Sequence, residues 1–536
     1  MVTPHVALNS AADPTPAWKL HGFRADADAL LAEHTLPHAW ARRWNEHPGA
    51  SALIDASGTE LTYGDLGRIA TATAVQLLRH GVTTNSRILV SATPSIDLIR
   101  LHVALLLIGA VVVPMNTAFT DVEVANIAAE AAVTVAILSD PKRSSQCRPH
   151  IEVLDVRLTR WGGVDPTDAD LFDPSVMDAI HGQSPAMLLF TSGTTGRPKG
   201  ALLSHSNLLA SAAALVSSWA WTAGDRLVLC LPLFHMHGLG VGVHGTLLAG
   251  ASAVVLPSFA EDLVFDAVRD HRPTLLFGVP TMWTRLSTHT RIGELSPLRL
   301  CVSGSASLAP EVWHTIATRA GQQIIERYGM TETVMLTSNP LVGQRKPGTV
   351  GLPLPGVEVK LRELGDDEVG EIVVRGPNVF AGYLDRPDAN IDAFIEGCWF
   401  RTGDLGRFDA DGYLSIVGRS KDLIITGGYN VYPSDVEAVL RLHESIAEVA
   451  VIGEPSTLWG ETVTACLVLD AGTDAAASHI SHHAEVIERV LAFGAEHLAP
   501  YQRPRRVVIV DTLPRNALGK VVKAALAEQV RLQPPH

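Results

Sequence analysis

The sequence is poor in the features that mark secreted, zinc-binding and nucleic-acid-binding chains. Its 536 residues include only 5 cysteines and no C-x-x-C pair, which argues against both a disulfide framework and a zinc ribbon. Positive charge is also scarce, because 42 Lys and Arg face 56 Asp and Glu and leave a net charge of −14. Such an acidic chain lacks the basic footprint of a nucleic-acid-binding protein. We expect the cysteines to be small buried residues in a reducing compartment.

Targeting segments and long apolar runs are missing as well. The N-terminus has no apolar core behind a basic start, and the C-terminal RLQPPH matches neither a lipidation box nor a peroxisomal signal. The most apolar stretch, residues 103–115, is too short to span a membrane and contains Gly109 and Pro114. It predicts a buried helix ending near Gly109 and then a short strand. We therefore expect a cytoplasmic protein without stable membrane insertion, as a monomer or homodimer.

The order of apolar runs predicts an α/β fold. Short β-rich runs at residues 87–93, 111–116 and 135–140 are separated by helical spans, as in βαβ units of a parallel sheet. Four later runs each end in Pro, Gly or Ser before a helix-like stretch: RLVLCLPL, SAVVLP, TLLFGVP and LRLCVSGS. Ligands of open α/β sheets bind at the carboxyl ends of the strands, so these ends are where we expect a site.

The pattern changes twice towards the C-terminus. After Gly348, alternation with period two indicates an antiparallel β-rich region, and after Arg419 the chain reads as a small α+β unit. We predict a large multi-layer N-terminal domain with parallel-rich sheets and a β-rich subdomain, followed by a small mobile α+β C-terminal domain. The predicted segments are an N-terminal extension (1–50, with a short helix before its Pro-Gly turn), the large domain (51–419) and the C-terminal domain (420–536).

Residues 191–200, TSGTTGRPKG, are the strongest motif in the chain. They follow the apolar run PAMLLF and combine glycines, hydroxyls and a lysine, which together suit a phosphate. The segment differs from the P-loop pattern G-x-x-x-x-G-K-[ST], because Gly200 stands where the hydroxyl residue would be. A turn joining a strand to a helix is the alternative, and the density of phosphate-binding residue types disfavours it.

Three weaker motifs follow. ERYGMTET (326–333) offers an aromatic ring that suits a purine and Glu332, which suits Mg²⁺, although a strand-to-helix turn explains it equally well alone. In FRTGD, the Asp404 carboxylate could accept both ribose hydroxyls. Asp409-x-Asp411-Gly412 resembles the start of a calcium loop but lacks its later ligands, so a hairpin turn is expected. Near the end, Lys520 follows Gly519, where a solvated surface charge is the alternative.

Other enzyme classes lack their motifs here. His235, His237 and His244 belong to no HExxH helix or Cys/His set, so one histidine near a ligand is favoured over a metal site. There is no G-x-S-x-G elbow of an α/β-hydrolase. No G-x-G-x-x-G follows an early strand, which argues against a nicotinamide enzyme.

Taken together, TSGTTGRPKG, YGMTE, RTGD, GRSKD and the late GK lysine resemble the adenylate-forming superfamily of acyl-CoA synthetases, peptide-synthetase adenylation domains and luciferases. The motifs stand in the family's order and extend the resemblance from about Ala52 to about Ala527. It implies an enzyme that uses ATP, Mg²⁺ and coenzyme A to convert a small carboxylic acid first to an acyl-adenylate and then to a thioester.

The resemblance also implies roles for individual residues. The phosphate loop comprises Thr191, Ser192, Gly193, Thr194, Thr195, Gly196 and Lys199. The adenine site comprises Ser303, Gly304, Ser305, Glu326, Arg327, Tyr328 and Gly329. The ribose contacts are Asp404 and Arg419. The catalytic set comprises Lys520, Thr331 at the α-phosphate, Glu332 and His235, with Glu332 and Thr191 as the Mg²⁺ contacts. Lys421 is the hinge, and Gly427, Gly428 and Tyr429 line the CoA tunnel.

The acid pocket implied by the resemblance contains His235, Gly238, Gly278, Met282, Ser305 and Met335. Within the superfamily, stretches such as LPLFHMHGLGVG and FGVPTMWTRL look like malonyl-CoA synthetases, in which an arginine at the position of Arg285 neutralises the acid's distal carboxylate. A bidentate guanidinium suits that task, but an arginine on a helix surface is the alternative, and Ser258 stands where some relatives have a basic residue. Malonate or methylmalonate is favoured.

Other readings of this resemblance stay open. A short- or medium-chain fatty acid or an aryl acid is the alternative substrate. A catalytically inactive nucleotide-binding protein on the same fold is the alternative of another class, against which Lys520, Glu332 and Asp404 count. A P-loop kinase or transport ATPase is a more distant alternative.

Overall fold

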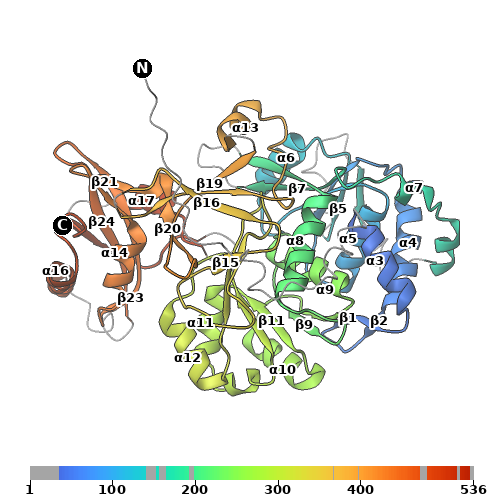
Figure 1. Cartoon of the computed structure of the whole chain (residues 1–536), viewed down its shortest axis with the longest axis horizontal. Coiled ribbons are helices and arrows are strands. Elements are labelled where there is room, and N and C mark those ends of the chain that lie inside the picture. Colours follow the sequence, from blue (N-terminus) through green and yellow to red (C-terminus); the bar gives the residue numbers. More distant parts are fainter. Residues whose placement is uncertain are drawn as a thin grey trace.

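The computed structural model describes residues 35–139, 152–155, 165–191, 198–365, 367–395, 398–470, 480–515 and 520–531. Figure 1 shows a large body coloured blue to yellow and a smaller orange-to-red part that stands at one end of it, beside the yellow strands. None of the helices in these residues is long and apolar enough to cross a membrane. The α/β architecture predicted from the sequence, with a large domain and a small C-terminal one, is confirmed.

A nine-stranded sheet forms the first half of the large domain. Its six central strands are parallel, and β2, β14 and β15 at the edges are antiparallel to their neighbours. In spatial order the strands are β15 (Leu352–Pro353), β14 (Thr337–Ser338), β13 (Ile325–Tyr328), β12 (Leu300–Ser303), β11 (Leu275–Gly278), β9 (Arg226–Leu229), β10 (Ser252–Val255), β1 (Ser51–Asp55) and β2 (Glu60–Thr62). The carboxyl ends of β9, β11, β12 and β13 therefore meet at one edge, as the sequence predicted.

A six-stranded sheet forms the second half. It is parallel apart from the antiparallel pair β7 and β8, which joins the two arms of the phosphate loop. The strands run in the order β6 (Glu152–Asp155), β5 (Val135–Leu138), β3 (Arg87–Ser91), β4 (Val111–Pro114), β7 (Pro185–Thr191) and β8 (Lys199–Ser204). The apolar stretch at 103–115 divides as expected into the end of a buried helix and the strand β4.

Helices fill the space between the two sheets and cover their outer faces. Those that share one apolar cluster with both sheets are α3 (Leu36–Glu46), α4 (Tyr63–Arg79), α5 (Ile96–Leu107), α8 (His205–Ser218) and α9 (His244–Ala249). Helices α10 (Glu261–His271), α11 (Pro280–Thr288) and α12 (Pro310–Ala320) pack on the other face of the nine-stranded sheet. On the six-stranded sheet the outer helix is α6 (Asp121–Glu130).

The predicted end of the N-terminal extension at residue 50 lies too late in the chain. Helix α3 has Trp40 fully buried in the central cluster, and it packs against α4, α5, α8 and α9. Its N-cap Thr35 accepts a hydrogen bond from the His38 N–H. The buried indole makes α3 part of the large domain, which sequence reasoning could not see because the helix carries no motif.

The β-rich subdomain is an antiparallel sheet of β16 (Glu358–Arg362), β17 (Gly370–Arg375), β19 (Trp399–Phe408), β18 (Phe394–Ile395) and β20 (Leu414–Arg419). Asp409 and Asp411 occupy the turn between β19 and β20, and both bind the Lys346 ammonium at 2.6 Å. Asp409 also accepts the backbone N–H groups of Asp411 and Tyr413. The expected hairpin turn is confirmed at this position.

The C-terminal part has a sheet of its own. Strand β20 ends at Arg419, a short 3₁₀ turn η7 (Ser420–Asp422) follows, and the next strand belongs to the new sheet. Its elements are β21 (Ile424–Thr426), β22 (Tyr429–Val431), α14 (Pro433–Leu440), β23 (Ile446–Ser456), β24 (Gly460–Leu469), α16 (Ile480–His497), β25 (Arg506–Ile509) and α17 (Lys523–Arg531). Tyr432 packs against Val369, Leu405 and Val417 of the β-rich subdomain and joins the two units next to η7.

Candidate active site

The phosphate-loop motif lies between two paired strands. Thr191 is the last residue of β7 and Lys199 is the first residue of β8, and the two are partners in the antiparallel register. The Thr191 hydroxyl donates to the Lys199 carbonyl at 3.4 Å. Ser192, Gly193, Thr194, Thr195 and Gly196 lie outside the described residues, so their predicted role stays a prediction.

One predicted adenine residue, Tyr328, is connected to both predicted ribose residues, Asp404 and Arg419. The Tyr328 hydroxyl, at the end of β13, donates to Asp404 Oδ2 at 2.6 Å. Arg419 pairs with Asp404 across β19 and β20, with Nε 3.0 Å from Oδ1. Burial, followed by the Asp404 charge, raises the pKa of the Tyr328 phenol well above its usual value, so Tyr328 stays protonated and donates. The site thus presents an oriented carboxylate beside an aromatic ring.

Glu332 is a buried carboxyl group in the same region. Only 5% of it is exposed, and burial raises the pKa of its side chain. Its Oε1 accepts a hydrogen bond from the Tyr383 hydroxyl at 2.9 Å, and its Oε2 has no hydrogen-bond partner among the described residues. The preceding Gly329 allows this tight loop, because a Cβ there would lie 2.1 Å from the Val334 carbonyl oxygen. Thr331 is half-buried beside Glu332.

A buried carboxylate of this kind fits a magnesium ion. Mg²⁺ prefers oxygen ligands and is usually held by one or two protein groups together with substrate phosphates. Glu332 has no ion-pair partner among the described residues, and Thr191 offers a hydroxyl at the end of β7. The described residues contain no cluster of three or more His, Cys, Asp or Glu side chains that could hold a metal without such a substrate.

Arg327 is the most unusual charge in the site. It is 4% exposed, and its Nε and Nη2 have no hydrogen-bond partner among the described residues. Burial lowers the pKa of this guanidinium to about 9. The group lies across Gly304, where a Cβ would be 2.3 Å from the arginine Cζ, so glycine is needed there. A buried cation without an anion is costly, and this arrangement indicates that a ligand supplies the anion.

Two histidines face Arg327. Burial, followed by the charge of Arg327, lowers the pKa of His235 to about 4 and that of His237 well below its usual value, so both rings are neutral. His237 Nδ1 lies 3.5 Å from the Ser305 hydroxyl, and its Nε2 has no partner among the described residues. Ser305 itself has a φ of 74°, a strained conformation that is common at functional sites.

The remaining predicted pocket residues divide into two groups. Gly278 ends β11 beside Ser303 of β12, and Gly238 and Met335 are buried close to the same strand ends. Met282 is half-buried on the first turn of α11. Arg285 lies one turn further along α11, where over half of its side chain is exposed.

Arg285 does not offer a free guanidinium to the pocket, contrary to the prediction from the sequence. Its Nε and Nη2 each donate to one oxygen of Glu261 at 2.5 Å, and the group lies over the Phe259 ring. Glu261, at the start of α10, therefore fills the planar fork that the prediction assigned to a substrate carboxylate. Arg327, by contrast, has unfilled donors among the described residues.

Lys520 belongs to the C-terminal part, and its side chain is exposed. Desolvation and then the charges of Arg419 and Lys421 lower the pKa of its ammonium, whereas Asp404 and Asp422 oppose that shift. Lys520 is therefore within electrostatic range of the Asp404–Arg419 pair. Lys421 lies in η7, between the β-rich subdomain and the C-terminal sheet, where the hinge was predicted.

The predicted CoA loop forms the turn between β21 and β22. Gly427 and Gly428 have φ values of 57° and 85°, which suit a tight hairpin turn. Two exposed aromatic groups flank it. Tyr429 stacks on Tyr501 with ring centres 4.8 Å apart, and Trp459 accepts the Gly427 N–H at its carbonyl and carries the Arg505 guanidinium 4.2 Å from its ring. Sequence reasoning missed these partners, which no motif marks.

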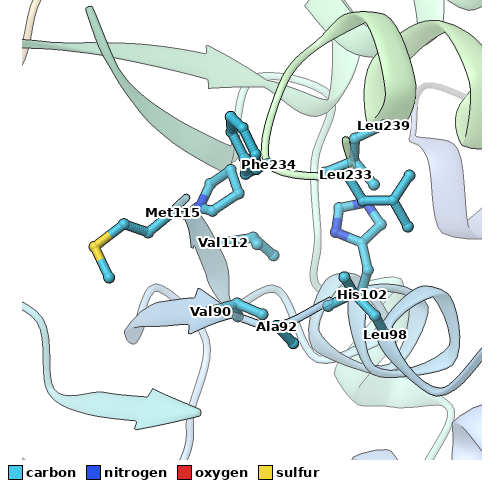
Figure 2. Close-up of a pocket in the computed structure, with 10 residues that line it drawn as sticks. Val90, Ala92, Leu98, His102, Val112, Met115, Leu233, Phe234 and Leu239 are labelled. Atoms are coloured by element: carbon cyan, nitrogen blue, oxygen red, sulfur yellow. The ribbon is translucent and has the colours of Figure 1, made fainter. Parts of the chain in front are cut away.

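A small apolar cavity lies beside the loop that carries His235 and His237. Figure 2 shows His102 and Phe234 among the side chains around it, at the ends of β3 and β4. Its volume of about 20 Å³ has room for about one water molecule. His102 Nε2 lies 2.8 Å from His244 Nε2, and burial lowers the pKa of His102 to about 3, so this pair is neutral.

The fold and these polar groups define a nucleotide-binding enzyme with a large α/β domain and a small C-terminal domain. The chain belongs to the AMP-binding enzyme family. The family model of that description matches residues 40–384, and the model described as the AMP-binding enzyme C-terminal domain matches residues 435–520.

Curated proteins and solved structures agree with this assignment. The chain is 31% identical to a malonate–CoA ligase of Arabidopsis thaliana, over 90% of this chain and 86% of that protein. It is 34% identical to an indoleacetate–CoA ligase of Aromatoleum aromaticum, over 89% of this chain and 94% of that protein. The ATP-bound structure of MatB from Rhodopseudomonas palustris matches with a TM-score of 0.81 and 35% identity, covering 93% of this chain and 99% of that one.

Proposed function

We propose that this protein is an AMP-forming acid–CoA ligase whose substrate is a small dicarboxylic acid of the malonate or methylmalonate type. The reaction has two steps. An oxygen of the acid's carboxylate attacks the α-phosphorus of ATP and releases pyrophosphate, and the thiol of CoA then attacks the acyl carbon and releases AMP. The relatives that carry a CoA-ligase name support the reaction class, and the malonate–CoA ligases among them support the acid.

The buried, unpaired guanidinium of Arg327 is the observation that carries the choice of acid. One carboxylate of the substrate must approach ATP, so a second carboxylate needs its own cation inside the protein. Arg327 has free donors, lies against Gly304 and faces His235 and His237. A fatty or aryl acid would leave this cation unpaired, which disfavours both alternatives.

The nucleotide residues suit the first step. Asp404 is oriented by Tyr328 and Arg419 to accept ribose hydroxyls, and Lys199 and Thr331 suit the phosphates. Magnesium, when bound at Glu332 and the phosphates, would supply positive charge that offsets the pyrophosphate. Lys520 lies close enough to Asp404 and Arg419 to stabilise the charge that develops between the acid and the α-phosphate.

The second step requires the thiol to reach the acyl-adenylate. The Trp459 ring lies against Gly427, where a Cβ would be 3.0 Å from it, so glycine keeps the turn narrow. The exposed rings of Tyr429 and Trp459 beside the turn suit the adenine of CoA. Arg505 beside Trp459 suits a phosphate of the same molecule. A rotation about Lys421 would exchange Lys520 for this turn at the site, which accounts for two reactions in one chain.

The test is a ligation screen over C2–C8 monocarboxylates, dicarboxylates and benzoates, with AMP, pyrophosphate and thioester measured. The proposal expects carboxylate-dependent exchange of pyrophosphate into ATP, strongest for malonate or methylmalonate, and then acyl-CoA. Absence of exchange with every acid would contradict the reaction and favour an inactive nucleotide-binding protein. Exchange that is strongest with monocarboxylates would contradict the acid, and release of ADP would indicate another enzyme class.

A further inference from the structure

Tyr383 lies where two parts of the nucleotide site meet. Its hydroxyl donates to Glu332 Oε1 at 2.9 Å, and the Lys199 ammonium lies over its ring, 5.2 Å from the ring centre. Glu332 is the carboxylate that fits magnesium, and Lys199 belongs to the phosphate loop. The Tyr383 side chain therefore contacts both the carboxylate that suits the metal ion and the ammonium that suits the phosphates.

The backbone of Tyr383 is fixed from two directions. Tyr383 forms an antiparallel bridge with Ala201 of β8, and the next residue, Leu384, donates its N–H to the Gly200 carbonyl at 2.9 Å. On the other side, Asn390 of α13 (Pro387–Ala393) accepts the Tyr383 N–H at 2.6 Å and donates to the Tyr383 carbonyl at 2.9 Å. These contacts leave the ring little freedom to move away from the site.

The ring and the glutamate loop are tied to the same segment. The Phe380 ring packs edge-on against Tyr383, with ring centres 4.9 Å apart and planes at 77°. The Phe380 N–H donates to the Glu332 carbonyl at 2.9 Å. Residues 380–384 therefore hold both the main chain and the side chain of Glu332 in place relative to β8.

We propose that Tyr383 is a positioning residue that orients Glu332 for magnesium and Lys199 for the ATP phosphates. Its hydroxyl occupies Glu332 Oε1, so the other carboxylate oxygen is left for the metal ion. Its ring keeps the Lys199 ammonium near the phosphate loop. Partners of metal-binding carboxylates set ligand orientation, and their loss costs about 10- to 100-fold in metal affinity or activity. This inference rests on the proposed function, because it assumes that Glu332 binds magnesium.

The two contacts can be separated by substitution. Tyr383→Phe removes the hydroxyl and keeps the ring, so it affects Glu332 and leaves Lys199 in place. Tyr383→Leu removes both contacts. Tyr413 offers a matched control, because its hydroxyl donates to the Gln344 carbonyl at 2.7 Å and its ring carries the Lys346 ammonium at 4.4 Å, in the β-rich subdomain. Tyr413→Phe thus removes a similar hydrogen bond outside the nucleotide site.

The experiment measures ATP binding by calorimetry without acid or CoA, once with Mn²⁺ and once in chelator. The dissociation constant in chelator divided by the one with Mn²⁺ reports the coupling between metal and ATP on the whole chain. We expect Tyr383→Phe to lower this ratio about 10-fold and to leave metal-free ATP binding unchanged. We expect Tyr383→Leu to weaken metal-free ATP binding as well, and Tyr413→Phe to change neither value.

The outcomes are distinct. An unchanged ratio in Tyr383→Phe would overturn the inference, as would an equal loss of ATP affinity with and without metal, which indicates a structural role only. If the wild-type protein bound ATP equally well with and without Mn²⁺, the result would instead contradict the magnesium binding that the proposed function assumes. Melting temperatures of the three variants separate these effects from loss of folding.

Discussion

The two halves of the site differ in how their polar groups are satisfied. On the nucleotide side, Tyr328, Asp404 and Arg419 bind one another, and Glu332 binds Tyr383. On the acid side, Arg327 and His237 keep unpartnered nitrogen atoms although both are almost fully buried. Among the described residues, Tyr328, Asp404 and Glu332 thus have protein partners, whereas Arg327 and His237 keep free nitrogen atoms that a ligand could fill.

This difference has an energetic consequence. A buried cation without an anion destabilises the fold, because desolvation is not offset by an ion pair. Arg327 therefore costs stability in the free protein, and a carboxylate bound there would recover it. Under the proposed function, specificity for a dicarboxylate follows from the same cost, since an acid without a second charge leaves Arg327 unpaired. The proposed acid side would thus exchange stability for selectivity.

The largest effect is expected at the residue that acts on both halves. Lys520→Ala should lower the rate of adenylate formation by at least about 100-fold, because it removes an oriented cation from the developing charge. Thioester formation from supplied acyl-adenylate should be spared, since Lys520 has no part in it. Pyrophosphate exchange and thioester release measure the two steps separately. Equal loss in both would contradict the assignment of the first step to Lys520 and of the second step to the turn at Gly427 and Gly428.

The acid side is tested most directly by Arg327→Met. The KM for malonate should rise about 10- to 100-fold, as expected for a charged hydrogen bond, while the KM for a monocarboxylate such as propionate changes little. Thermal unfolding should show an unchanged or higher melting temperature, because the unpaired cation is gone. A fall in stability together with an unchanged acid preference would show that Arg327 has a structural partner instead.

The neutral histidines should make the acid side sensitive to low pH. Folding lowers the pKa of His235 to about 4 and that of His237 well below its usual value, whereas the histidines of the unfolded chain titrate near pH 6.5. Their contribution to stability is therefore complete above pH 6.5 and falls as the pH drops below it, by about 1.4 kcal/mol per pH unit for each histidine. Urea unfolding at pH 7.5 and 5.5 measures this loss. A double variant, His235→Gln with His237→Asn, should reduce it, and an identical loss would contradict the assignment.

The positions of the predicted nucleotide residues follow from the sequence more directly than those of the acid side, for a physical reason. Tyr328 ends β13, Glu332 lies in the loop after it and Asp404 lies in β19, so contiguous motifs and a strand pattern place them. The hydrogen-bond partners of these residues cannot be found from motifs or strand patterns. Tyr383 reaches Glu332 only because a bridge brings it against β8.

The differences from the prediction have the same origin. Arg285 was chosen from its position after GVPT, and Arg327 was given to the adenine site. Only the contact between α10 and α11 shows that Glu261 fills the Arg285 fork. The helix α3 was placed outside the large domain because its one deeply buried tryptophan belongs to no motif. Contacts between distant segments were the part that a single sequence could not supply.

The exposed rings on the C-terminal part extend the comparison to the thiol substrate. Trp459→Ala should raise the KM for CoA about 10-fold, the usual size of one stacking contact with a base. Pantetheine, which lacks the adenine nucleotide, should show no difference between wild type and variant. Leu442→Ala, at another exposed apolar side chain of the C-terminal part, is the matched control. An equal effect on CoA and pantetheine would place Trp459 elsewhere in the reaction.

The smallest effect is expected at Arg285, and it separates the two arginines. Its bidentate pair with Glu261 lies on an exposed surface, where ion pairs contribute about 0–1 kcal/mol to stability. Arg285→Gln should therefore change the KM for malonate less than about 2-fold and leave the preference for dicarboxylates intact, as measured in the same assay as Arg327→Met. If Arg285→Gln instead abolished that preference, Glu261 would have to release Arg285 when the acid binds. The distal carboxylate would then be shared between two arginines, and the free protein would hold one of them in a closed, internally neutralised state.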